Sequence, residues 1–262
     1  MSGQRSFAEL VELCKRLRGP GGCPWDREQT LESLKTYVIE EAYEVVDAIS
    51  GGAPEKLSAE LGDLLFQIIF VADLATEKGW FDIFDVCGGI HAKMVQRHPH
   101  VFGEVEVSGA REVVRNWESL KQGEGREGGA LSGVPRQLPA LLKALRVTEK
   151  AAALGFDWQR VHDVGAKLEE EVAELTEQLN SGGGEESERR IREELGDVLF
   201  VMANLARQLG VDPEAALQSA NDKFARRFSA MEELARGRGA RVGALGPSEL
   251  DSLWEEVKRG ED

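Results

Sequence analysis

The sequence predicts an all-α protein made of two tandem, duplicated helical bundles, with no significant sheet. Apolar residues recur at helical spacing, convincing strand-like alternation is absent, and the same ordered blocks of sequence occur twice. The chain has 262 residues, which fits two domains at about 150 residues each. We therefore expect one helical bundle in each half of the chain.

The duplication is visible in four blocks that occur in both halves in the same order. The acidic block at 40–44, Glu-Glu-Ala-Tyr-Glu, returns at 170–174 as Glu-Glu-Val-Ala-Glu. The block at 60–66, Glu-Leu-Gly-Asp-Leu-Leu-Phe, returns nearly unchanged at 194–200. A Lys-x-x-x-Arg block and a Trp-x-x-x-Lys block are also repeated, as Lys93 and Arg97, Lys223 and Arg227, Trp117 and Lys121, and Trp254 and Lys258.

Glycines mark the boundary between the two units. Five of them fall between Gln122 and Pro135, where they interrupt any periodic pattern. We place an N-terminal domain at residues 1–122, a Gly-rich linker at 123–134 and a C-terminal domain at 135–262.

Inside each unit the apolar residues follow the helical repeat. In the first unit Leu34, Val38 and Val45 fall on one stripe of a helix. A short Gly-rich segment, at 50–54 in the first unit and 181–184 in the second, separates the two acidic blocks. Each acidic block therefore lies on its own helix, and the two helices form a hairpin.

Carboxylates occupy positions of these helices where apolar side chains are expected. Glu41 lies between Val38 and Val45 on the stripe that should face the core, and Glu171 has the equivalent place in the second unit. Further acids follow at three-residue spacing, so each hairpin directs four carboxylates to one place. The two sets are Glu41, Glu44, Glu60 and Asp63, and Glu171, Glu174, Glu194 and Asp197.

Four carboxylates this close need a cation between them, because two like charges about 4 Å apart repel by about 4 kcal/mol at an effective dielectric constant of about 20. Oxygen ligands with no Cys or His nearby favour Mg²⁺ or Mn²⁺ over zinc. A di-iron carboxylate centre is disfavoured because the sequence contains no Glu-x-x-His. The alternative is that these acids are solvated helix residues, as most Glu are, but duplication of both blocks weakens that interpretation.

Such a metal favours a phosphate-containing substrate, because Mg²⁺ held by carboxylates completes its shell with waters and substrate phosphates. Lys223 with Arg227, and Lys93 with Arg97, each supply two cations one helical turn apart. The sequence has no P-loop pattern. We therefore expect metal and side chains, rather than a glycine loop, to bind the phosphates.

Two further features have more than one interpretation. Trp254 and Lys258 would offer an aromatic face and another cation, although core packing is the commoner role of a Trp on a helix. The segment Arg97-His-Pro-His-Val-Phe-Gly has the composition of a reactive site, but it has no counterpart after Arg227. A turn in which Pro99 ends the helix is the favoured interpretation.

Composition disfavours several partners and environments. The formal net charge of −15 repels nucleic acid, and no apolar stretch approaches the roughly 20 residues of a membrane helix. The N-terminus lacks the apolar core of a signal peptide. Cys14, Cys23 and Cys87 are an odd number without CxxC spacing, which is typical of reduced thiols. We expect a cytoplasmic protein that binds neither nucleic acid nor membrane.

Several of these motifs resemble those of the MazG family of nucleoside triphosphate pyrophosphohydrolases, over essentially the whole chain. They are Gly22-Cys-Pro-Trp-Asp, Glu40-Glu-x-x-Glu44, Glu60-Leu-Gly-Asp63 and Arg97-His-Pro-His-Val-Phe-Gly. The paired acidic motif is shared with the wider all-α NTP pyrophosphohydrolase superfamily. The resemblance implies Mg²⁺-dependent hydrolysis of (deoxy)nucleoside triphosphates to monophosphate and pyrophosphate, in house-cleaning or nucleotide-pool control. It also implies a homodimer or higher homo-oligomer.

The resemblance further implies roles for residues, and it makes the second unit the main catalytic one. The metal ligands would be Glu171, Glu174, Glu194 and Asp197. The nucleotide contacts would be Lys167, Arg190, Lys223, Arg227, Trp254 and Lys258. A carboxylate would accept the proton of the attacking water, from among Glu170, Glu171, Glu174 and Glu193. A second working site in the first unit stays open, with Glu41, Glu44, Glu60, Asp63, Lys93 and Arg97.

Two other classes of function remain open. A nucleotide-sensing regulatory module would use the same site without turnover. A helical scaffold with solvated acids would bind neither Mg²⁺ nor nucleotide. The sequence does not indicate a base preference, because one Trp face accepts any base.

Overall fold

The structure is a computed structural model that describes residues 6–109, 112–113, 129 and 131–260. The described residues form helices and no strands, which confirms the predicted all-α class. Contacts divide the chain into two compact units, Met1–Ala110 and Arg111–Asp262. Most of the predicted linker at 123–134, with Trp117 and Lys121 before it, lies outside the described residues. Among the helices described, none is long and apolar enough to span a membrane.

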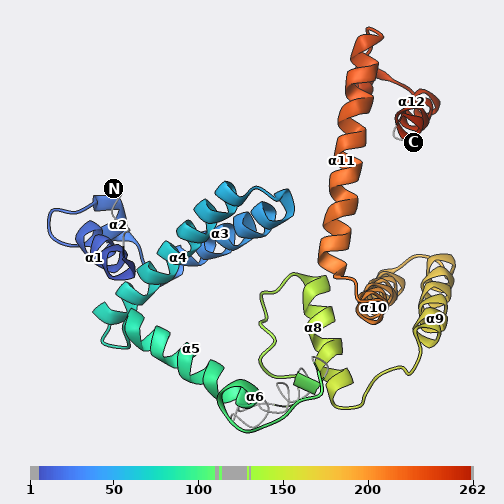
Figure 1. Ribbon diagram of the computed structural model, residues 1–262. Helices are drawn as coiled ribbons and strands as arrows, with labels where there is room; N and C mark the ends of the chain where they lie inside the picture. The colour runs from blue at the N-terminus through green and yellow to red at the C-terminus, as the bar shows by residue number, and fades with distance from the viewer. Residues whose placement is uncertain (1–5, 110–111, 114–128, 130, 261–262) are drawn as a thin grey trace. The chain divides into compact units, whose positions relative to one another are not determined.

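The described part of the first unit is a helical hairpin with shorter helices beside it, the last of which lead away from it (Figure 1). The helices α3 and α4 form the hairpin; α1 and α5 contact α4, α2 contacts α1, and α6 contacts α5. Their bounds are α1 (Phe7–Arg18), α2 (Pro24–Glu28), α3 (Leu31–Gly51), α4 (Pro54–Glu77), α5 (Ile83–Arg97) and α6 (Pro99–Phe102).

Local sequence explains where the hairpin helices begin and end. Thr30 caps α3, because its hydroxyl oxygen accepts a hydrogen bond from the backbone N–H of Ser33 at 3.2 Å. Gly52 ends α3 with φ of 66°, a left-handed conformation that favours glycine. Pro54 then begins α4, where its missing N–H costs no helical hydrogen bond. The Gly-rich segment therefore forms the turn that the sequence predicts.

The core of the first unit lies where α1, α3 and α4 meet. Leu34 of α3 is 1% exposed, and Cys14 of α1 is fully buried. They pack with Ile69 and Phe70 of α4, and Ile83 at the start of α5 belongs to the same cluster. The apolar stripe of α3 thus faces this core, so the acids of that helix lie beside it.

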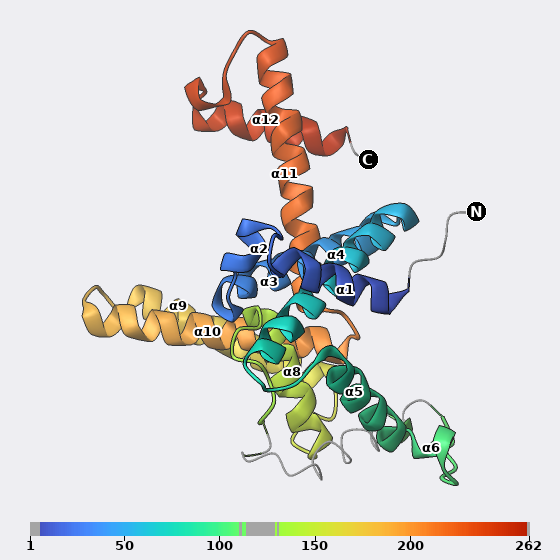
Figure 2. The same ribbon diagram turned by 90° about the vertical axis from the view of Figure 1, so that its left-hand side faces the viewer.

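The second unit repeats the hairpin with α9 and α10, and α8 packs on α10 (Figure 2). The long helix α11 contacts α8 and α10, and α12 packs on α11 through Met231, Ala235 and Leu253. The bounds are α8 (Ala140–Ala153), α9 (Val161–Asn180), α10 (Glu185–Gln208), α11 (Pro213–Gly237), the 3₁₀ turn η1 (Val242–Ala244) and α12 (Pro247–Arg259).

The two units differ in the helix that follows each hairpin. In the first unit α5 has 15 residues and ends at Arg97, because Pro99 cannot donate a helical hydrogen bond. A new short helix, α6, begins at Pro99. In the second unit Ser229, not a proline, stands two residues after Arg227, and α11 continues to 25 residues. The helix break predicted at Pro99 is therefore present in the first unit. The second unit has no proline at the equivalent position, so α11 continues as one long helix.

In each unit an arginine ties the segment that precedes the hairpin to the hairpin's second helix, and the arginine and the acid have exchanged places between the units. In the first unit Arg18 of α1 donates to Asp73 of α4 at 2.8 Å and to the backbone oxygen of Asp26 at 2.7 Å. In the second unit the arginine is on the hairpin itself, where Arg207 of α10 pairs with Asp157 of the loop. These contacts hold α2, and the loop at Asp157, against the second helix of the hairpin in the same unit.

Candidate active site

The two acidic blocks of the second unit meet across the α9–α10 hairpin. Carboxylate oxygens of Glu171, Glu194 and Asp197 lie within 4.8 Å of one another. Glu171 is only 6% exposed, Glu194 is half-buried and Asp197 is exposed. We call these three residues the acidic triplet. The triplet is therefore exposed to solvent at Asp197 and buried at Glu171.

Glu174, expected as a fourth member, is exposed and lies outside the triplet. It nevertheless acts on the triplet electrostatically. Partial burial raises the pKa of the Glu194 carboxyl, and the neighbouring charges of Glu174, Asp197 and Glu171 raise it further. The site therefore concentrates negative charge, as a cation-binding site does.

Lys167 compensates the charge of the buried Glu171. Its ammonium nitrogen lies 2.9 Å from Glu171 Oε1 and 2.6 Å from Glu170 Oε1. These hydrogen bonds raise the pKa of Lys167. The Lys167 side chain is a third exposed.

Two other predicted residues of the hairpin lie in exposed ion pairs. The Glu193 carboxylate accepts a hydrogen bond from Arg189 at 2.8 Å. Arg190 donates to Glu186 at 3.2 Å. Exposed pairs of this kind contribute little stability and exchange partners readily. Both side chains can therefore turn to another partner at low cost.

A group of cations and aromatic rings gathers on α11 and α12. The rings of Phe224 and Phe228 stack with centroids 6.1 Å apart, and Phe224 lies 5.3 Å from the Trp254 ring. Lys223 is exposed beside them, and Arg227 is half-buried. We call these five residues, with Lys258, the cationic aromatic group.

Lys258 and Arg227 both act on the same acid of α12. Lys258 donates to Glu255 at 2.8 Å, and it is the main cause of the lowered pKa of that carboxyl, to which Arg227 adds. Trp254 also packs in the small core of α11 and α12, which confirms the core-packing role expected of a Trp on a helix. The sequence analysis missed Phe224 and Phe228, although their spacing of four residues beside Lys223 and Arg227 is a readable signal.

The first unit has its own cluster of acids in the equivalent place. Carboxylate oxygens of Glu41, Glu44 and Glu60 lie within 4.8 Å of one another. Partial burial raises the pKa of Glu41, and the charges of Asp63 and Glu44 raise it further. Asp63, expected in this cluster, is outside the three but acts on it. Each unit therefore keeps a close group of three acids, but a different acid lies outside the group in each: Asp63 in the first unit and Glu174 in the second.

Two differences set the first cluster apart. Tyr37 stands where the second unit has Lys167, and its ring meets Trp25 edge to face at 5.8 Å. Arg97, the counterpart of Arg227, is 7% exposed, whereas Lys93 is exposed. The first unit thus lacks an ammonium group at this edge of its acids.

The His-Pro-His segment links the end of α5 to the short helix α6, which begins at Pro99. His98 Nδ1 lies 2.6 Å from the backbone oxygen of Met94, and the rings of His98 and His100 are 5.6 Å apart. These contacts join α5 to α6. They fit the structural interpretation of the segment.

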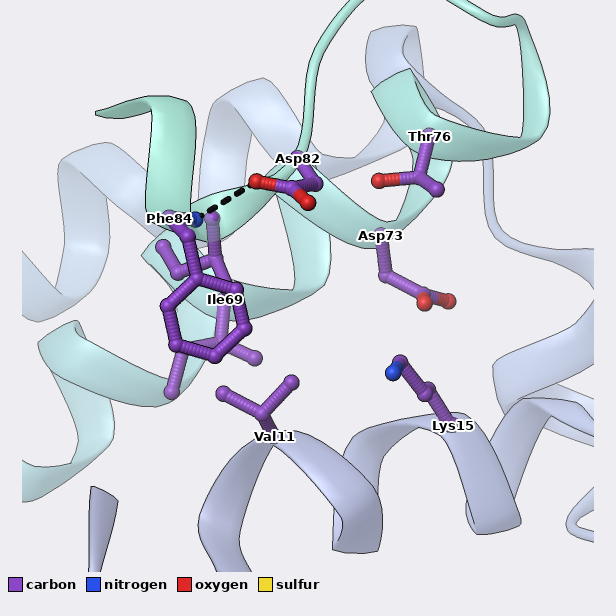
Figure 3. Close-up of a pocket in the computed structure, with 8 residues that line it drawn as sticks. Val11, Lys15, Ile69, Asp73, Thr76, Asp82 and Phe84 are labelled. Atoms are coloured by element: carbon purple, nitrogen blue, oxygen red, sulfur yellow. Dashed lines mark hydrogen bonds between the residues drawn. The ribbon is translucent and has the colours of Figure 1, made fainter. Parts of the chain in front are cut away.

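A small cavity of about 80 Å³ lies in the first unit between α1, α4 and the start of α5 (Figure 3). Val11 and Ile69 form its apolar wall, and Lys15, Asp73 and Asp82 form its polar side. Ligand pockets are usually several times larger, and the acids of α3 do not line this cavity. It is a packing gap beside the core rather than a nucleotide site.

Comparison with known proteins gives the same result for both halves of the chain. Residues 29–102 and 159–230 match the model of the MazG nucleotide pyrophosphohydrolase domain. The chain is 40% identical to a nucleoside triphosphate pyrophosphohydrolase of Escherichia coli strain K12, over 96% of this chain and 97% of that protein. It is 42% identical to the nucleoside triphosphate pyrophosphohydrolase/pyrophosphatase MazG of Thermotoga maritima, over 98% and 97%. The crystal structure of a mazG-related protein from Thermotoga maritima covers 44% of this chain and 98% of its own, at 27% identity and a TM-score of 0.38.

Proposed function

This chain belongs to the family of the MazG nucleotide pyrophosphohydrolase domain, and on that premise we propose that it hydrolyses nucleoside triphosphates to nucleoside monophosphates and pyrophosphate. The observation that carries the proposal is the acidic triplet, with oxygens of Glu171, Glu194 and Asp197 within 4.8 Å of one another. Two relatives that match almost end to end are named nucleoside triphosphate pyrophosphohydrolases, which supports the proposal. House-cleaning or control of the nucleotide pool is the role we propose for the activity.

The donor set fits Mg²⁺, with Mn²⁺ as the alternative. The ligating atoms are carboxylate oxygens, and neither Cys nor His belongs to the triplet. Glu171, Glu194 and Asp197 would hold the ion, with Glu174 as the fourth ligand. When bound, Mg²⁺ neutralises phosphate oxygens and lowers the pKa of a coordinated water.

The side chains around the triplet would bind and orient the substrate. Lys167 pairs with Glu171 of the triplet and has a third of its side chain exposed, and we propose that its ammonium group contacts a phosphate oxygen. Arg190, held only by an exposed ion pair, would turn to the same phosphates. We propose that the proton of the attacking water passes to a carboxylate of this group, from among Glu170, Glu171, Glu174 and Glu193.

The cationic aromatic group would bind the rest of the nucleotide. Lys223, Arg227 and Lys258 supply charge for the phosphates. Phe224 and Trp254 offer ring faces on which a base can stack, and stacking tolerates every base. We therefore expect the enzyme to accept several bases.

Exposed apolar residues at equivalent positions of both hairpins support a homodimer or higher homo-oligomer. Leu61 and Leu65 of α4 are 49% and 37% exposed, and their counterparts Leu195 and Leu199 of α10 are each 47% exposed. Patches of this kind mark interaction surfaces in soluble proteins. We therefore propose that the chain self-associates, in the cytoplasm. We also propose that it does not bind nucleic acid, because its net charge is −15.

We place the main catalytic unit in the second half of the chain. The first unit keeps acids and cations in the same pattern, as Glu41, Glu44, Glu60, Asp63, Lys93 and Arg97. Its Tyr37 in place of Lys167 and its buried Arg97 make it the poorer phosphate site. A second, weaker site there remains part of the proposal.

A product assay tests the proposed function. The purified chain is incubated with each nucleoside triphosphate and deoxynucleoside triphosphate and Mg²⁺, and monophosphate, diphosphate, phosphate and pyrophosphate are separated. We expect monophosphate and pyrophosphate, lost in Glu174→Ala and nearly unchanged in the matched variant Glu44→Ala. Diphosphate with phosphate would contradict the bond assignment. Nucleotide binding without any product would instead indicate a nucleotide sensor.

A further inference from the structure

Asn204 is a buried polar residue of α10 whose amide nitrogen has no hydrogen-bond partner. Its side chain is 1% exposed, and its Nδ2 donor makes no hydrogen bond to any residue that the structure describes. An unpaired buried donor opposes folding, and such groups are few in native proteins. The second unit therefore keeps at this position a residue that stability alone does not favour.

The first unit has an apolar residue at the same position. The repeat of the block 60–66 at 194–200 aligns Asn204 with Phe70, which is 2% exposed and belongs to the core of its unit. Arg18 of α1 lies over the Phe70 ring, with its Cζ atom 5.1 Å from the ring centroid. An apolar side chain thus fits this place on the second helix of a hairpin, so the amide of Asn204 needs an explanation other than packing.

The carbonyl oxygen of Asn204 takes part in a network that ties α10 to the segment between α8 and α9. Asn204 Oδ1 accepts a hydrogen bond from Arg207 Nε at 2.9 Å, and Nη2 of the same arginine pairs with Asp157. Gln208 Nε2 donates to the Asp157 carboxylate at 3.2 Å and to the backbone oxygen of Trp158 at 3.0 Å. The segment runs from the end of α8 to the start of α9 (Figure 1). We call the side chains of Asn204, Arg207, Gln208 and Asp157 the loop clamp.

The other end of α9 is joined to α10 by a turn with much backbone freedom. The turn spans 181–184 and contains three glycines, of which Gly182 and Gly184 have φ of 90° and 130°. In the first unit only Gly52 and Ala53 separate α3 from α4, which begins at Pro54. Because glycine restricts the backbone least, the position of α9 along α10 depends more on the loop clamp than on this turn.

The acidic triplet depends on the position of α9 along α10. Glu171 comes from α9, whereas Glu194 and Asp197 come from α10, and their carboxylate oxygens lie within 4.8 Å of one another. Glu171 lies ten residues after Val161, where α9 begins, a distance of about 15 Å along the helix. A helix carries a shift of its start to the residues that follow, and functional sites tolerate displacements of only about 0.5 Å.

We infer that Asn204 is a positioning residue for the metal site of the second unit. Through the loop clamp it holds α9 at the position along α10 where Glu171 meets the two acids of α10. This inference rests on the proposed function and identifies a residue that the site needs although it contacts neither metal nor substrate. It also explains why a buried amide stands where the first unit has Phe70.

Direct titration with Mn²⁺, which suits the same oxygen ligands, tests the inference. Binding is followed by electron paramagnetic resonance in a parent chain that carries Glu44→Ala, so that the acids of the first unit do not mask the second site. Asn204→Leu removes the accepting oxygen together with the unpaired donor, and Asn204→Asp keeps an accepting oxygen. Thr148→Val is the matched control, because Thr148 is 6% exposed and its hydroxyl donates to backbone oxygens of its own helix.

Asn204→Leu should raise the Mn²⁺ dissociation constant by at least about tenfold, the loss typical when a group that orients metal ligands is removed. Its melting temperature without metal should equal or exceed that of the parent chain, because no buried donor is left unpaired. Asn204→Asp and Thr148→Val should keep the Mn²⁺ affinity of the parent. A purely structural role of Asn204 predicts instead that melting temperature and affinity fall together. That outcome, or an unchanged affinity in Asn204→Leu, would overturn the inference.

Asp157→Asn tests the other end of the loop clamp without altering the core, since the Asp157 side chain is 29% exposed. It removes the charge with which Arg207 pairs, and it should weaken Mn²⁺ binding as well. Asp163→Asn is its control, because Asp163 is 31% exposed and pairs with Arg160 three residues away rather than with α10. Equal Mn²⁺ binding by these two variants would show that the clamp does not position α9.

Product analysis of the wild-type chain separates this inference from the proposed function. Absence of pyrophosphate from the wild type, together with weaker Mn²⁺ binding in Asn204→Leu, would refute hydrolysis and support the positioning role. Release of pyrophosphate, together with equal Mn²⁺ binding in Asn204→Leu and its parent, would support hydrolysis and refute the positioning role. Absence of Mn²⁺ binding to the parent chain would refute both.

Discussion

Replacing Arg18 by Met should destabilise the first unit by about 3 kcal/mol. The Arg18 side chain is 5% exposed, and it donates to Asp73 at 2.8 Å and to the backbone oxygen of Asp26 at 2.7 Å. Breaking a buried ion pair by removing one partner costs about 3–5 kcal/mol. Asp73 is 15% exposed, which places the loss at the lower end. The ion pair with Glu77 adds little, because Glu77 is 55% exposed.

The assay is thermal and denaturant unfolding of the full chain. About 3 kcal/mol should lower the melting temperature of the first unit by at least about 10 °C. Arg16→Met is the matched control, since Arg16 lies on the same helix and is exposed; it should change the free energy of unfolding by less than about 0.5 kcal/mol. If Arg18→Met cost no more than Arg16→Met, Arg18 would not anchor α1 and α2 to α4, and the reasoning would fail.

Three further predictions concern the second unit. Glu194→Gln should abolish hydrolysis while raising the melting temperature of the metal-free protein, and a calorimetric scan with and without Mg²⁺ would show both effects. The pKa of Glu194 is raised in the folded state, so its contribution to stability is present at acid pH and is lost as pH rises through the folded pKa. The gain in melting temperature from Glu194→Gln should therefore grow with pH. A gain that does not depend on pH would contradict this assignment. Trp254→Ala should raise KM for the nucleotide and loosen α12, whereas Trp254→Phe keeps a ring on Phe224 and should restore most of the affinity; steady-state kinetics with both variants would detect a purely structural role, in which KM stays constant. Leu199→Asp should weaken self-association because it places a charge in an exposed apolar stripe, and sedimentation over a range of concentrations should show smaller species than Glu193→Asp, a neighbouring exposed position.

Much of this structure could be predicted from the sequence, because the signals are local or repeated. The acidic blocks lie on α3 and α4 and on α9 and α10, separated by Gly-rich turns, as spacing predicts. Helical periodicity placed Glu171 on a stripe that faces the core, and it is 6% exposed. The duplication made each of these predictions twice, so an accidental pattern in one half was unlikely to be repeated in the other.

Spacing alone could not assign the distances within the site. It directed four carboxylates to one place in each unit, whereas Glu174 and Asp63 lie outside the close groups. A helix stripe fixes the direction of a side chain only to within a fraction of a turn, and the packing of two helices decides which oxygens meet. The compensation of Glu171 by Lys167 depends in the same way on rotamers that no sequence pattern specifies.

The sequence by itself determined the all-α class, the two repeated hairpins and the acids that they bring together, because helix period and chain duplication are properties of local order. Only the tertiary structure decided which groups are partners across long separations. Arg18 and Asp73 are 55 residues apart in the chain, and Arg207 pairs with Asp157 with the charges reversed. The tertiary structure also leaves Phe224 and Phe228 of α11 exposed to solvent. Burial and pairing are set by the packing of whole helices, and that packing is a property of the folded chain.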